Sequence, residues 1–348
     1  MDPSETAASA ARWQSRIRCA LRALGLMALG FVLLVPTLWA TAALYFDVRM
    51  PWLRGPLAAG YLLAALAVWI FVKHRCRAVV LTVAGFMLVL GWWFTLQPSN
   101  SRDWQPDVAV LPYADIEGNT ITLHNIRNCD YRTETDFDVR HRDKTYELDK
   151  LRTADLYTVY WGSPYMAHAM VSFGFGGGDY LCFSIETRKE KGESYSAVKG
   201  LFRQFEITYI VADERDVVRL RTNFRTGEEA YLYRLNASLE RLRKFFLDYL
   251  HRMNSLRERP EWYHAVTDNC STAIRLQQAR EDRTPIDGRM LVNGYGDTLL
   301  YERGMISTNL PFAELKERGH LNARAKAADK AVDFSRLIRQ GVPGMEPN

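Results

Sequence analysis

The chain has 348 residues, of which 48% are hydrophobic, and it carries 45 Lys and Arg against 40 Asp and Glu. This apolar content excludes a disordered chain, and five cysteines in this length exclude a small disulfide-rich scaffold. The first 98 residues hold nine basic and three acidic side chains, whereas the other 250 hold 36 basic and 37 acidic ones. The net charge of +5 therefore arises in the first hundred residues and gives no indication of nucleic-acid binding.

Three apolar stretches without internal charge lie in the first hundred residues: Ala23–Phe46, Pro56–Val72 and Ala78–Thr95. A helix of about 20 apolar residues crosses the roughly 30 Å of a bilayer's hydrocarbon core. These stretches therefore predict a three-span membrane anchor over residues 23–97, preceded by an N-terminal arm at residues 1–22. Buried core helices are the alternative, but three of them in succession argue against it.

The positive residues that flank the spans predict how the anchor is oriented. Seven of them lie before the first span or between the second and third: Arg12, Arg16, Arg18, Arg22, Lys73, Arg75 and Arg77. Only Arg49 and Arg54 lie between the first and second spans. Because Lys and Arg accumulate on the cytoplasmic side, we expect a cytoplasmic N-terminus and residues after 97 on the far side. A cleaved signal peptide ending near Ala40-Thr41-Ala42 is the alternative, but its apolar region would be unusually long.

The chain after residue 98 mixes β-branched and aromatic residues in short runs that are typical of strands. The predicted strands are Val108–Leu111, Thr120–Asn125, Leu156–Trp161, Met166–Phe175, Tyr180–Glu186, Phe202–Val211, Val217–Arg221 and Ala230–Tyr233. Apolar residues then recur at helical spacing over Leu239–Met253, with Asn236 or Ser238 as the N-cap. Two more helices are predicted, one beginning at Asn269-Cys270 and one over Ala323–Arg339. The fold class is therefore α+β, preceded by three transmembrane helices.

Two segments invite a ligand-binding interpretation that the sequence does not favour. Gly176-Gly177-Gly178 lacks the Lys-Ser/Thr ending of a phosphate loop, so we expect a hairpin turn between two strands. The segment His124–Lys150 is rich in charge but lacks the glycine and terminal glutamate of a calcium loop, which favours a solvated, salt-bridged surface. No cluster of His, Cys and Asp has metal-ligand spacing, so neither a metal nor another cofactor is predicted.

Cys270 has the setting of a reactive thiol. The cysteines are Cys19, Cys76, Cys129, Cys182 and Cys270, and the last three lie beyond the anchor. An odd number of cysteines in an oxidising compartment leaves at least one thiol unpaired. Cys270 follows Asp268-Asn269, which is a candidate helix N-cap, and the positive end of a helix dipole lowers a thiol pKa from about 8.5 towards roughly 3.5–7.5. A nucleophile for covalent catalysis is expected at such a position.

A thiol nucleophile needs a base, and His168 is the candidate. It lies within the predicted strand Met166–Phe175, and the hairpin brings the next strand, with Ser184 and Glu186, beside it. Glu186 would hold the imidazole in one tautomer, as the third residue of a catalytic triad does. A histidine that merely packs within the sheet is the alternative interpretation.

Ordered blocks of residues along the soluble half also carry a likeness to a known family. The blocks are His168–Phe175, Phe183–Glu190, Phe205-Glu206, Glu214, Arg219–Arg221, Tyr231–Tyr233, Asn254, Tyr263 and Asn269–Thr272. Together they resemble the periplasmic domain of the lipoprotein N-acyltransferase Lnb family over about residues 100–280. A strand histidine followed by a cysteine at a helix start also resembles permuted papain-like thiol folds, such as NlpC-type amidases and lecithin:retinol acyltransferases. The resemblance implies a periplasmic catalytic domain at residues 98–280. The resemblance does not cover the chain after that, where the helical pattern predicts a C-terminal extension at residues 281–348.

The resemblance implies acyl transfer on the periplasmic side of a bacterial inner membrane. Cys270 would be the nucleophile and His168 its base, with Glu186 or Ser184 as the orienting polar group. An ester acyl group of a lipoprotein's diacylglyceryl-cysteine would pass through a thioester to the α-amine of that cysteine. The partner is then a membrane lipid or lipoprotein, because removing acyl chains from a bilayer costs about 0.8 kcal/mol per CH₂.

The resemblance also suggests residues that would bind the substrate: Arg188, Arg219, Arg221, Tyr263 and Asn269. The three arginines would contact a polar headgroup or would pair with glutamates, and the sequence favours pairing because unpaired charges are costly to bury. The glutamates available for this are Glu186, Glu206 and Glu214.

Two other functions remain open from the sequence: a cell-envelope thiol hydrolase or amidase, and an anchored module without catalysis in which Cys270 is structural. Aromatic and apolar residues in the strand region favour an acyl slot over the open polar groove of an amidase. They are Tyr157, Tyr160, Trp161, Tyr165, Met166, Phe173 and Phe175. The alternative is that these side chains form the core.

Overall fold

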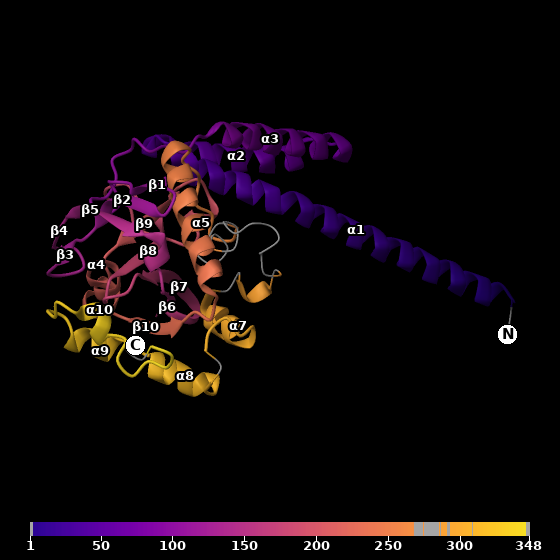
Figure 1. Cartoon of the computed structure of the whole chain (residues 1–348). Coiled ribbons are helices and arrows are strands. Elements are labelled where there is room, and N and C mark those ends of the chain that lie inside the picture. Colours follow the sequence, from indigo (N-terminus) through magenta and orange to yellow (C-terminus); the bar gives the residue numbers. More distant parts are fainter. Residues whose placement is uncertain are drawn as a thin grey trace. The chain divides into compact units, whose positions relative to one another are not determined.

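A computed structural model describes residues 3–267, 274, 285, 287–290, 293–307 and 309–345. The chain divides into two compact units, Met1–Gln97 and Pro98–Asn348 (Figure 1). The first unit holds three long helices, α1 (Pro3–Asp47), α2 (Pro51–Phe71) and α3 (Arg75–Thr95).

The helices of the first unit confirm the three predicted membrane spans. The segments long and apolar enough to cross a membrane are Met27–Asp47, Pro51–Phe71 and Arg75–Thr95. Some polar groups within these helices have partners inside the unit. Trp93 Nε1 donates a hydrogen bond to Asp47 Oδ2 at 2.8 Å, which satisfies a carboxylate at the end of α1.

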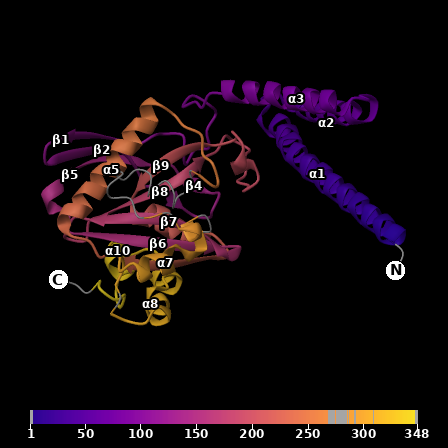
Figure 2. The same cartoon turned by 90° about the vertical axis from the view of Figure 1, so that its right-hand side faces the viewer.

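The second unit is an α+β domain built on an eight-stranded sheet, as the sequence predicts for its class. Its strands are β1 (Tyr113–Glu117), β2 (Thr120–Arg127), β5 (His141–Glu147), β6 (Thr153–Trp161), β7 (Ser163–Gly174), β8 (Tyr180–Arg188), β9 (Glu206–Ala212) and β10 (Glu228–Arg234). Their order is β1-β2-β9-β8-β7-β6-β10, with β5 paired to β2 (Figure 2). Paired strands run antiparallel except β2 and β9. A separate small sheet pairs β3 (Asp130–Tyr131) with β4 (Phe137–Asp138).

The first face of the sheet is apolar and is covered by α5 (Leu239–Glu258). Alternate residues of each strand point to this face. Those paired in register across β6 to β9 include Leu156, Val171, Phe183 and Val211. Phe246 of α5 packs edge-on against Phe173, with ring centroids 5.0 Å apart. As predicted, Ser238 caps α5, and its side chain accepts a hydrogen bond from Arg241 N.

The opposite face mixes apolar residues with polar and charged ones. Across β6 to β9 it presents, in register, Tyr157, Met170, Ser184 and Ile210. The elements that share its buried cluster are α4 (Glu214–Arg219), α9 (Asn322–Ala327) and α10 (Phe334–Leu337). A π-helical turn, Leu220–Phe224, continues α4. In Figure 1 the C-terminal helices gather beside β10 and β6, so this part of the chain belongs to the same domain.

The prediction of a strand at Val217–Arg221 is wrong, because this segment forms α4 and the π-helical turn. Asp213 caps α4, and its side chain accepts a hydrogen bond from Arg215 N at 3.0 Å. The adjacent valines suggested a strand, but the cap and two distant arginines that bind acidic residues of α4 favour the helix.

The prediction of a strand at Val108–Leu111 is also wrong, because this segment is a turn and the first strand begins at Tyr113. The carbonyls of Val108 and Ala109 accept hydrogen bonds from Arg188, so they do not join a strand ladder. The expected strand over Phe202–Val211 begins only at Glu206. The expected single helix over Ala323–Arg339 is two short helices, α9 and α10.

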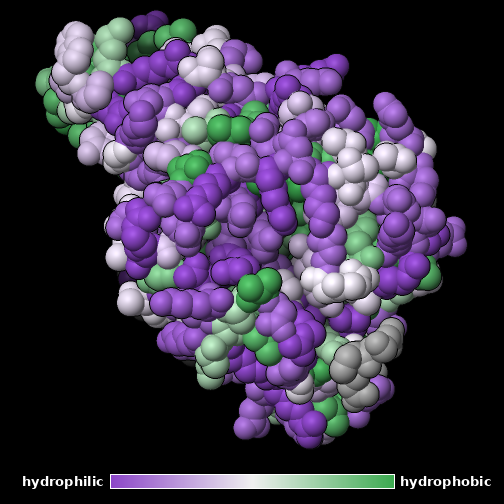
Figure 3. All heavy atoms as spheres, turned by 60° about the vertical axis from the view of Figure 1, so that its left-hand side comes forward, coloured by the Kyte–Doolittle hydropathy of each residue, from purple (hydrophilic) through white to green (hydrophobic). Residues whose placement is uncertain are grey.

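The charged segment His124–Lys150 is a salt-bridged surface, as predicted, but it also contains β5, which the sequence did not indicate. Arg132 binds Asp136 at 2.6 Å and Asp138 at 3.1 Å, and all three side chains are about half exposed. Figure 3 shows that hydrophilic side chains cover most of the face that carries β3 to β5. The three glycines at positions 176–178 all have positive φ and form the predicted hairpin turn between β7 and β8.

Candidate active site

The candidate site is built on two neighbouring strands of the mixed face. His168 lies on β7, and Ser184 and Glu186 lie on β8. Met170 pairs with Ser184 in the antiparallel register, so His168 lies beside Glu186 two residues further along. The period of two along each strand directs all three side chains to the same face. The structure therefore brings together the histidine and both candidate orienting groups.

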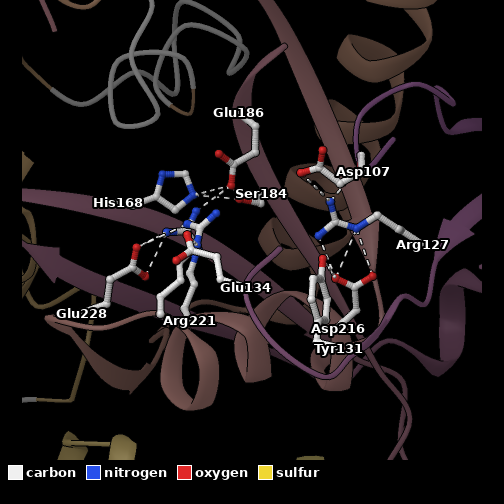
Figure 4. Close-up of polar contacts among 11 residues, drawn as sticks. Asp107, Arg127, Tyr131, Glu134, His168, Ser184, Glu186, Asp216, Arg221 and Glu228 are labelled. Atoms are coloured by element: carbon white, nitrogen blue, oxygen red, sulfur yellow. Dashed lines mark hydrogen bonds and ion pairs between the residues drawn. The ribbon is translucent and has the colours of Figure 1, made fainter. Parts of the chain in front are cut away.

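Three hydrogen-bonding groups converge within this cluster (Figure 4). Ser184 Oγ lies 2.7 Å from His168 Nε2 and donates to Glu186 Oε1 at 2.6 Å. The same carboxylate oxygen lies 3.2 Å from His168 Nε2. Ser184 is fully buried and the His168 side chain is 12% exposed, so the contacts are largely shielded from bulk water. Both orienting groups proposed from the sequence thus act on the same imidazole nitrogen.

The direction of these hydrogen bonds assigns the tautomer of His168. Ser184 gives its single hydroxyl proton to Glu186, so it accepts from Nε2 of the histidine. Nε2 then carries a proton, and the lone pair of the neutral ring belongs to Nδ1. A base with this arrangement takes up a proton at Nδ1, and the resulting imidazolium is stabilised through Nε2–H by Glu186.

A buried arginine completes the cluster. Arg221 Nη2 donates to Glu186 Oε1 at 2.7 Å, and its Nη1 lies 3.3 Å from Glu228 Oε2. Burial opposes ionisation of Glu186, but the charges of His168 and Arg221 outweigh it and lower the pKa of Glu186 well below its usual range. Glu186 therefore stays a carboxylate at neutral pH.

The other two arginines proposed to bind substrate are buried and engaged elsewhere. Arg188 is 2% exposed and donates to backbone carbonyls of residues 108 and 109 and to Asn100 Oδ1. Arg219 binds Asp329 at 2.7 Å. Of the three arginines expected to pair with glutamates, Arg221 does so, with Glu186, and the expectation is wrong for Arg188 and Arg219. The other two glutamates bind arginines that the sequence analysis did not single out, Glu206 with Arg102 and Glu214 with Arg339.

The two remaining predicted site residues and the predicted nucleophile lie near or beyond a gap in the described chain. Tyr263 is largely buried, and its backbone N–H donates to the carbonyl of Phe205 at 2.9 Å. Asn269 and Cys270, with the helix expected to begin there, lie outside the described residues. Their roles stay predictions.

The two described cysteines beyond the anchor are poor nucleophiles. Cys129 and Cys182 are buried thiols. Burial and the nearby Asp216 carboxylate raise the pKa of Cys129 to about 11, and burial raises that of Cys182 well above its usual value. Neither forms a thiolate near neutral pH, which leaves Cys270 as the candidate thiol of the soluble half.

Two further buried ion networks lie on the mixed face without a histidine in them. Arg127 binds the fully buried Asp216 at 2.7 Å, and Figure 4 shows this pair apart from the His168 cluster. Arg339 binds Glu214 at 2.6 Å and Asp155 at 2.8 Å. In the described part of the chain, no group of three His, Cys, Asp or Glu could hold a metal ion.

Five of the seven residues proposed to line an acyl slot divide into two groups, and the other two, Tyr160 and Trp161, are half-buried. Tyr157, Phe173 and Phe175 are buried in the core, which confirms the alternative interpretation for them. Tyr165 and Met166, at the tip of the β6–β7 hairpin, are 56% and 38% exposed. They immediately precede the part of β7 that carries His168, so apolar surface lies at the end of the strand nearest the candidate base.

Sequence reasoning missed Glu228 and Arg339. Both come from elements distant in sequence, and their positions became apparent only with the β6–β10 pairing and the C-terminal packing. No local signal marks either residue, since each looks like an ordinary surface charge in its own segment.

Comparison with known proteins places the site within a recognised domain. Residues 137–294 match the family model described as the Lnb N-terminal periplasmic domain. The matched segment contains His168, Ser184, Glu186, Arg221 and Cys270. No curated protein and no solved structure matches the chain.

Proposed function

From the premise that the chain carries an Lnb N-terminal periplasmic domain behind three membrane-anchoring helices, we propose that it is a cysteine-dependent acyltransferase acting on membrane lipoproteins. Cys270 is the nucleophile, His168 is its base, and Ser184 and Glu186 orient the imidazole. The observation that carries the proposal is the hydrogen-bonded chain from His168 Nε2 to Ser184 and Glu186, inside the matched segment. In this proposal the domain is a permuted papain-like fold on the periplasmic side of the bacterial inner membrane.

The first half of the reaction forms a thioester. His168 Nδ1 takes the proton of the Cys270 thiol, and the thiolate attacks the carbonyl carbon of an ester in the diacylglyceryl group. The C–O bond to glycerol breaks as the tetrahedral intermediate collapses, and the imidazolium gives its proton to the departing alkoxide. The acyl group is then bound to sulfur, and the glycerol carries one free hydroxyl.

The second half transfers the acyl group to nitrogen. The neutral α-amine of the lipoprotein's terminal cysteine attacks the thioester carbonyl, and His168 takes a proton from the attacking nitrogen. The C–S bond breaks, the Cys270 sulfur takes the proton back from the imidazolium, and an amide remains. No external oxidant, reductant or metal is required for the balance.

The exposed apolar tip of the β6–β7 hairpin supports an acylated substrate over a sugar or peptide one. Tyr165 and Met166 expose apolar surface two to three residues before His168. An acyl chain that leaves a bilayer would be shielded from water by contact with this surface. A polar cell-wall fragment gains nothing from such a surface, which makes the envelope amidase the second candidate.

The experiment is a transfer assay with the full chain in detergent micelles and a synthetic diacyl lipopeptide. We expect the wild type to yield an N-acylated lyso-lipopeptide of unchanged mass but altered fragmentation, and Cys270→Ser and His168→Ala to yield none. Release of free fatty acid without N-acylation would favour a hydrolase. An unaltered lipopeptide with all three proteins, together with cleavage of muropeptides by the wild type, would replace the transferase by an amidase.

A further inference from the structure

Three polar groups meet at one oxygen of Glu186. Oε1 receives Ser184 Oγ at 2.6 Å and Arg221 Nη2 at 2.7 Å, and it lies 3.2 Å from His168 Nε2. The Glu186 side chain is 26% exposed, whereas that of Arg221 is 6% exposed. The arginine is therefore the buried, fixed partner, and the glutamate is the one that could otherwise turn towards water.

The backbone around Arg221 is a π-helical turn. Leu220–Phe224 follows α4 directly, and Arg225 N donates to the carbonyl of Leu220 at 3.0 Å, a spacing of five residues. Such widened turns are rare and occur frequently at functional sites. Two arginines that are two residues apart therefore have different partners. Arg219, at the end of α4, binds Asp329, whereas Arg221, in the π-helical turn, binds Glu186.

A second carboxylate binds the other terminal nitrogen of the Arg221 guanidinium. Glu228, at the start of β10, is 10% exposed and lies 3.3 Å from Arg221 Nη1. It is also 3.3 Å from Arg225 Nη1, and Arg225 in turn binds Glu134 at 3.1 Å (Figure 4). The guanidinium of Arg221 thus bridges two carboxylates, and its planar fork fixes the directions in which they lie.

We propose that Arg221 is a positioning residue that acts through Glu186: held by Glu228 and the π-helical turn, it keeps Glu186 Oε1 against His168 Nε2. This inference rests on the proposed function, because it assigns a role within the same thiol site. Arg221 contacts neither the thiol nor the acyl group in this scheme. Its effect is to keep the carboxylate that stabilises the imidazolium from rotating away.

The charged and polar groups that face this imidazole come from several elements. The described ones are Ser184 and Glu186 from β8, Thr208 opposite Glu186 on β9, Arg221 from the π-helical turn and Glu228 from β10. Removing Arg221 would therefore change the pKa of His168 in two ways, and these have opposite signs. Loss of a nearby cation alone would raise the pKa of His168, whereas loss of the aligned carboxylate would lower it.

The test uses Arg221→Gln, Arg221→Lys and the matched control Arg219→Gln in the full chain. Arg219 is an equally buried, ion-paired arginine two residues away that does not bind Glu186. We expect Arg221→Gln to slow acylation of Cys270 by the lipopeptide about ten- to a hundredfold, with KM unchanged; this is the range seen when outer-shell partners of metal-binding histidines are removed. The acidic limb of the pH–rate profile, which reports deprotonation of the base, should move to lower pH, and Arg221→Lys should recover part of the rate.

A titration of His168 by ¹⁵N NMR, assigned with His168→Ala, gives a readout that needs no catalysis. We expect its pKa to fall in Arg221→Gln and to stay unchanged in Arg219→Gln. A rise or no change in Arg221→Gln would overturn the inference, even if acyl transfer by the wild type is confirmed. Conversely, a fall in a protein that transfers no acyl group would leave the positioning role intact and remove the proposed function.

Discussion

Both faces of the sheet carry a buried cluster, but the clusters differ in composition. The face under α5 is filled by aromatic and aliphatic side chains such as Phe173, Phe183 and Phe246. The opposite face buries carboxylates and guanidinium groups, among them Glu214 and Arg339, next to its apolar residues. Burying apolar side chains stabilises a fold directly, whereas buried charges recover only part of their lost hydration. The α5 face therefore supplies the stability that allows the mixed face to hold charged groups in fixed positions.

Three of the ion clusters on the mixed face lie around α4 and β8, and one of these three contains a histidine. The Arg127–Asp216 and Arg339–Glu214 pairs fix α4 from two sides, and α4 leads into the turn that carries Arg221. The His168 cluster is the one of the three with a side chain that changes charge near neutral pH. Chemistry is thus expected at the third cluster, and mechanical support at the other two.

The largest expected effect on activity comes from the mixed face. We expect His168→Ala to reduce acyl transfer by about 10²- to 10⁴-fold, the usual contribution of a positioned base, with little change in Tm. His124→Ala is the matched control, because His124 also binds carboxylates but lies on β2 and contacts none of the His168 cluster. Transfer rates and Tm measured together check this. Equal losses of activity in both variants would mean that the site has been misplaced.

The largest expected effect on stability comes from the α5 face. Phe173 is fully buried and packs against Phe183, Phe245, Phe246 and Tyr249. Phe173→Ala should lower the free energy of unfolding by about 3–5 kcal/mol, because it leaves a cavity among these rings. Chemical denaturation of the protein in micelles measures this, and the activity per folded molecule should stay the same. A selective loss of activity would show that the two faces are not separate in function.

Arg339→Ala tests whether the supporting clusters contribute stability. It leaves Glu214 and Asp155 buried without this cation, which costs about 3–5 kcal/mol in comparable buried pairs. Arg336→Ala, in α10 three residues before Arg339, is the control, because the ion-pair partner of Arg336 among the described residues is the exposed Asp333, and its loss should leave Tm unchanged. Similar Tm values for both variants would contradict the supporting role of the C-terminal segment.

Glu206 predicts a pH dependence of stability on the mixed face. Burial raises the pKa of Glu206 to about 7, above the value of about 4.5 expected in the unfolded chain. Between these values the folded chain binds a proton that the unfolded chain releases, so stability falls as the pH rises from about 4.5 to about 7. The loss is at most about 3 kcal/mol. Tm should decline over this window in the wild type and decline less in Glu206→Gln; parallel curves would remove Glu206 as the cause.

The smallest expected effect concerns the hairpin tip. If Tyr165 shields an acyl chain, Tyr165→Asp should raise KM for a lipopeptide in bilayer vesicles by about tenfold, or roughly 1.4 kcal/mol, with kcat unchanged. Val332→Asp, at another strongly exposed apolar residue, is the control. Unchanged KM in Tyr165→Asp would separate the exposed tip from substrate binding.

The features that sequence reasoning predicted are those fixed by local pattern. The three spans follow from hydropathy, and β7 and β8 follow from alternation and a glycine turn, which together place His168 beside Ser184 and Glu186. Pairing of Arg221 with a glutamate was expected because charges without partners are costly to bury, and it forms with Glu186.

The features that could not be predicted depend on contacts between distant segments. Val217 and Val218 have strand propensity, yet α4 forms because Asp213 caps it and arginines 89 and 125 residues away bind its acidic side chains. The sequence did not indicate β5, because most of its side chains are charged or exposed. The segment at Val108 was expected to be a strand, but the carbonyl of Val108 accepts a hydrogen bond from the distant Arg188 instead of a strand partner. The predicted nucleophile, Cys270, lies outside the described residues, so its role depends on experiment.

Trapping the acyl-enzyme tests the central claim most directly. The full chain in micelles is incubated with a diacyl lipopeptide whose α-amine is acetylated, so that the second half-reaction is blocked, and peptide mass spectrometry locates any adduct. We predict one acyl group on Cys270 that neutral hydroxylamine removes, present in the wild type and in His124→Ala and absent in Cys270→Ser and His168→Ala. An acyl group on another residue, or an equal yield in His168→Ala, would contradict the proposed thiol mechanism.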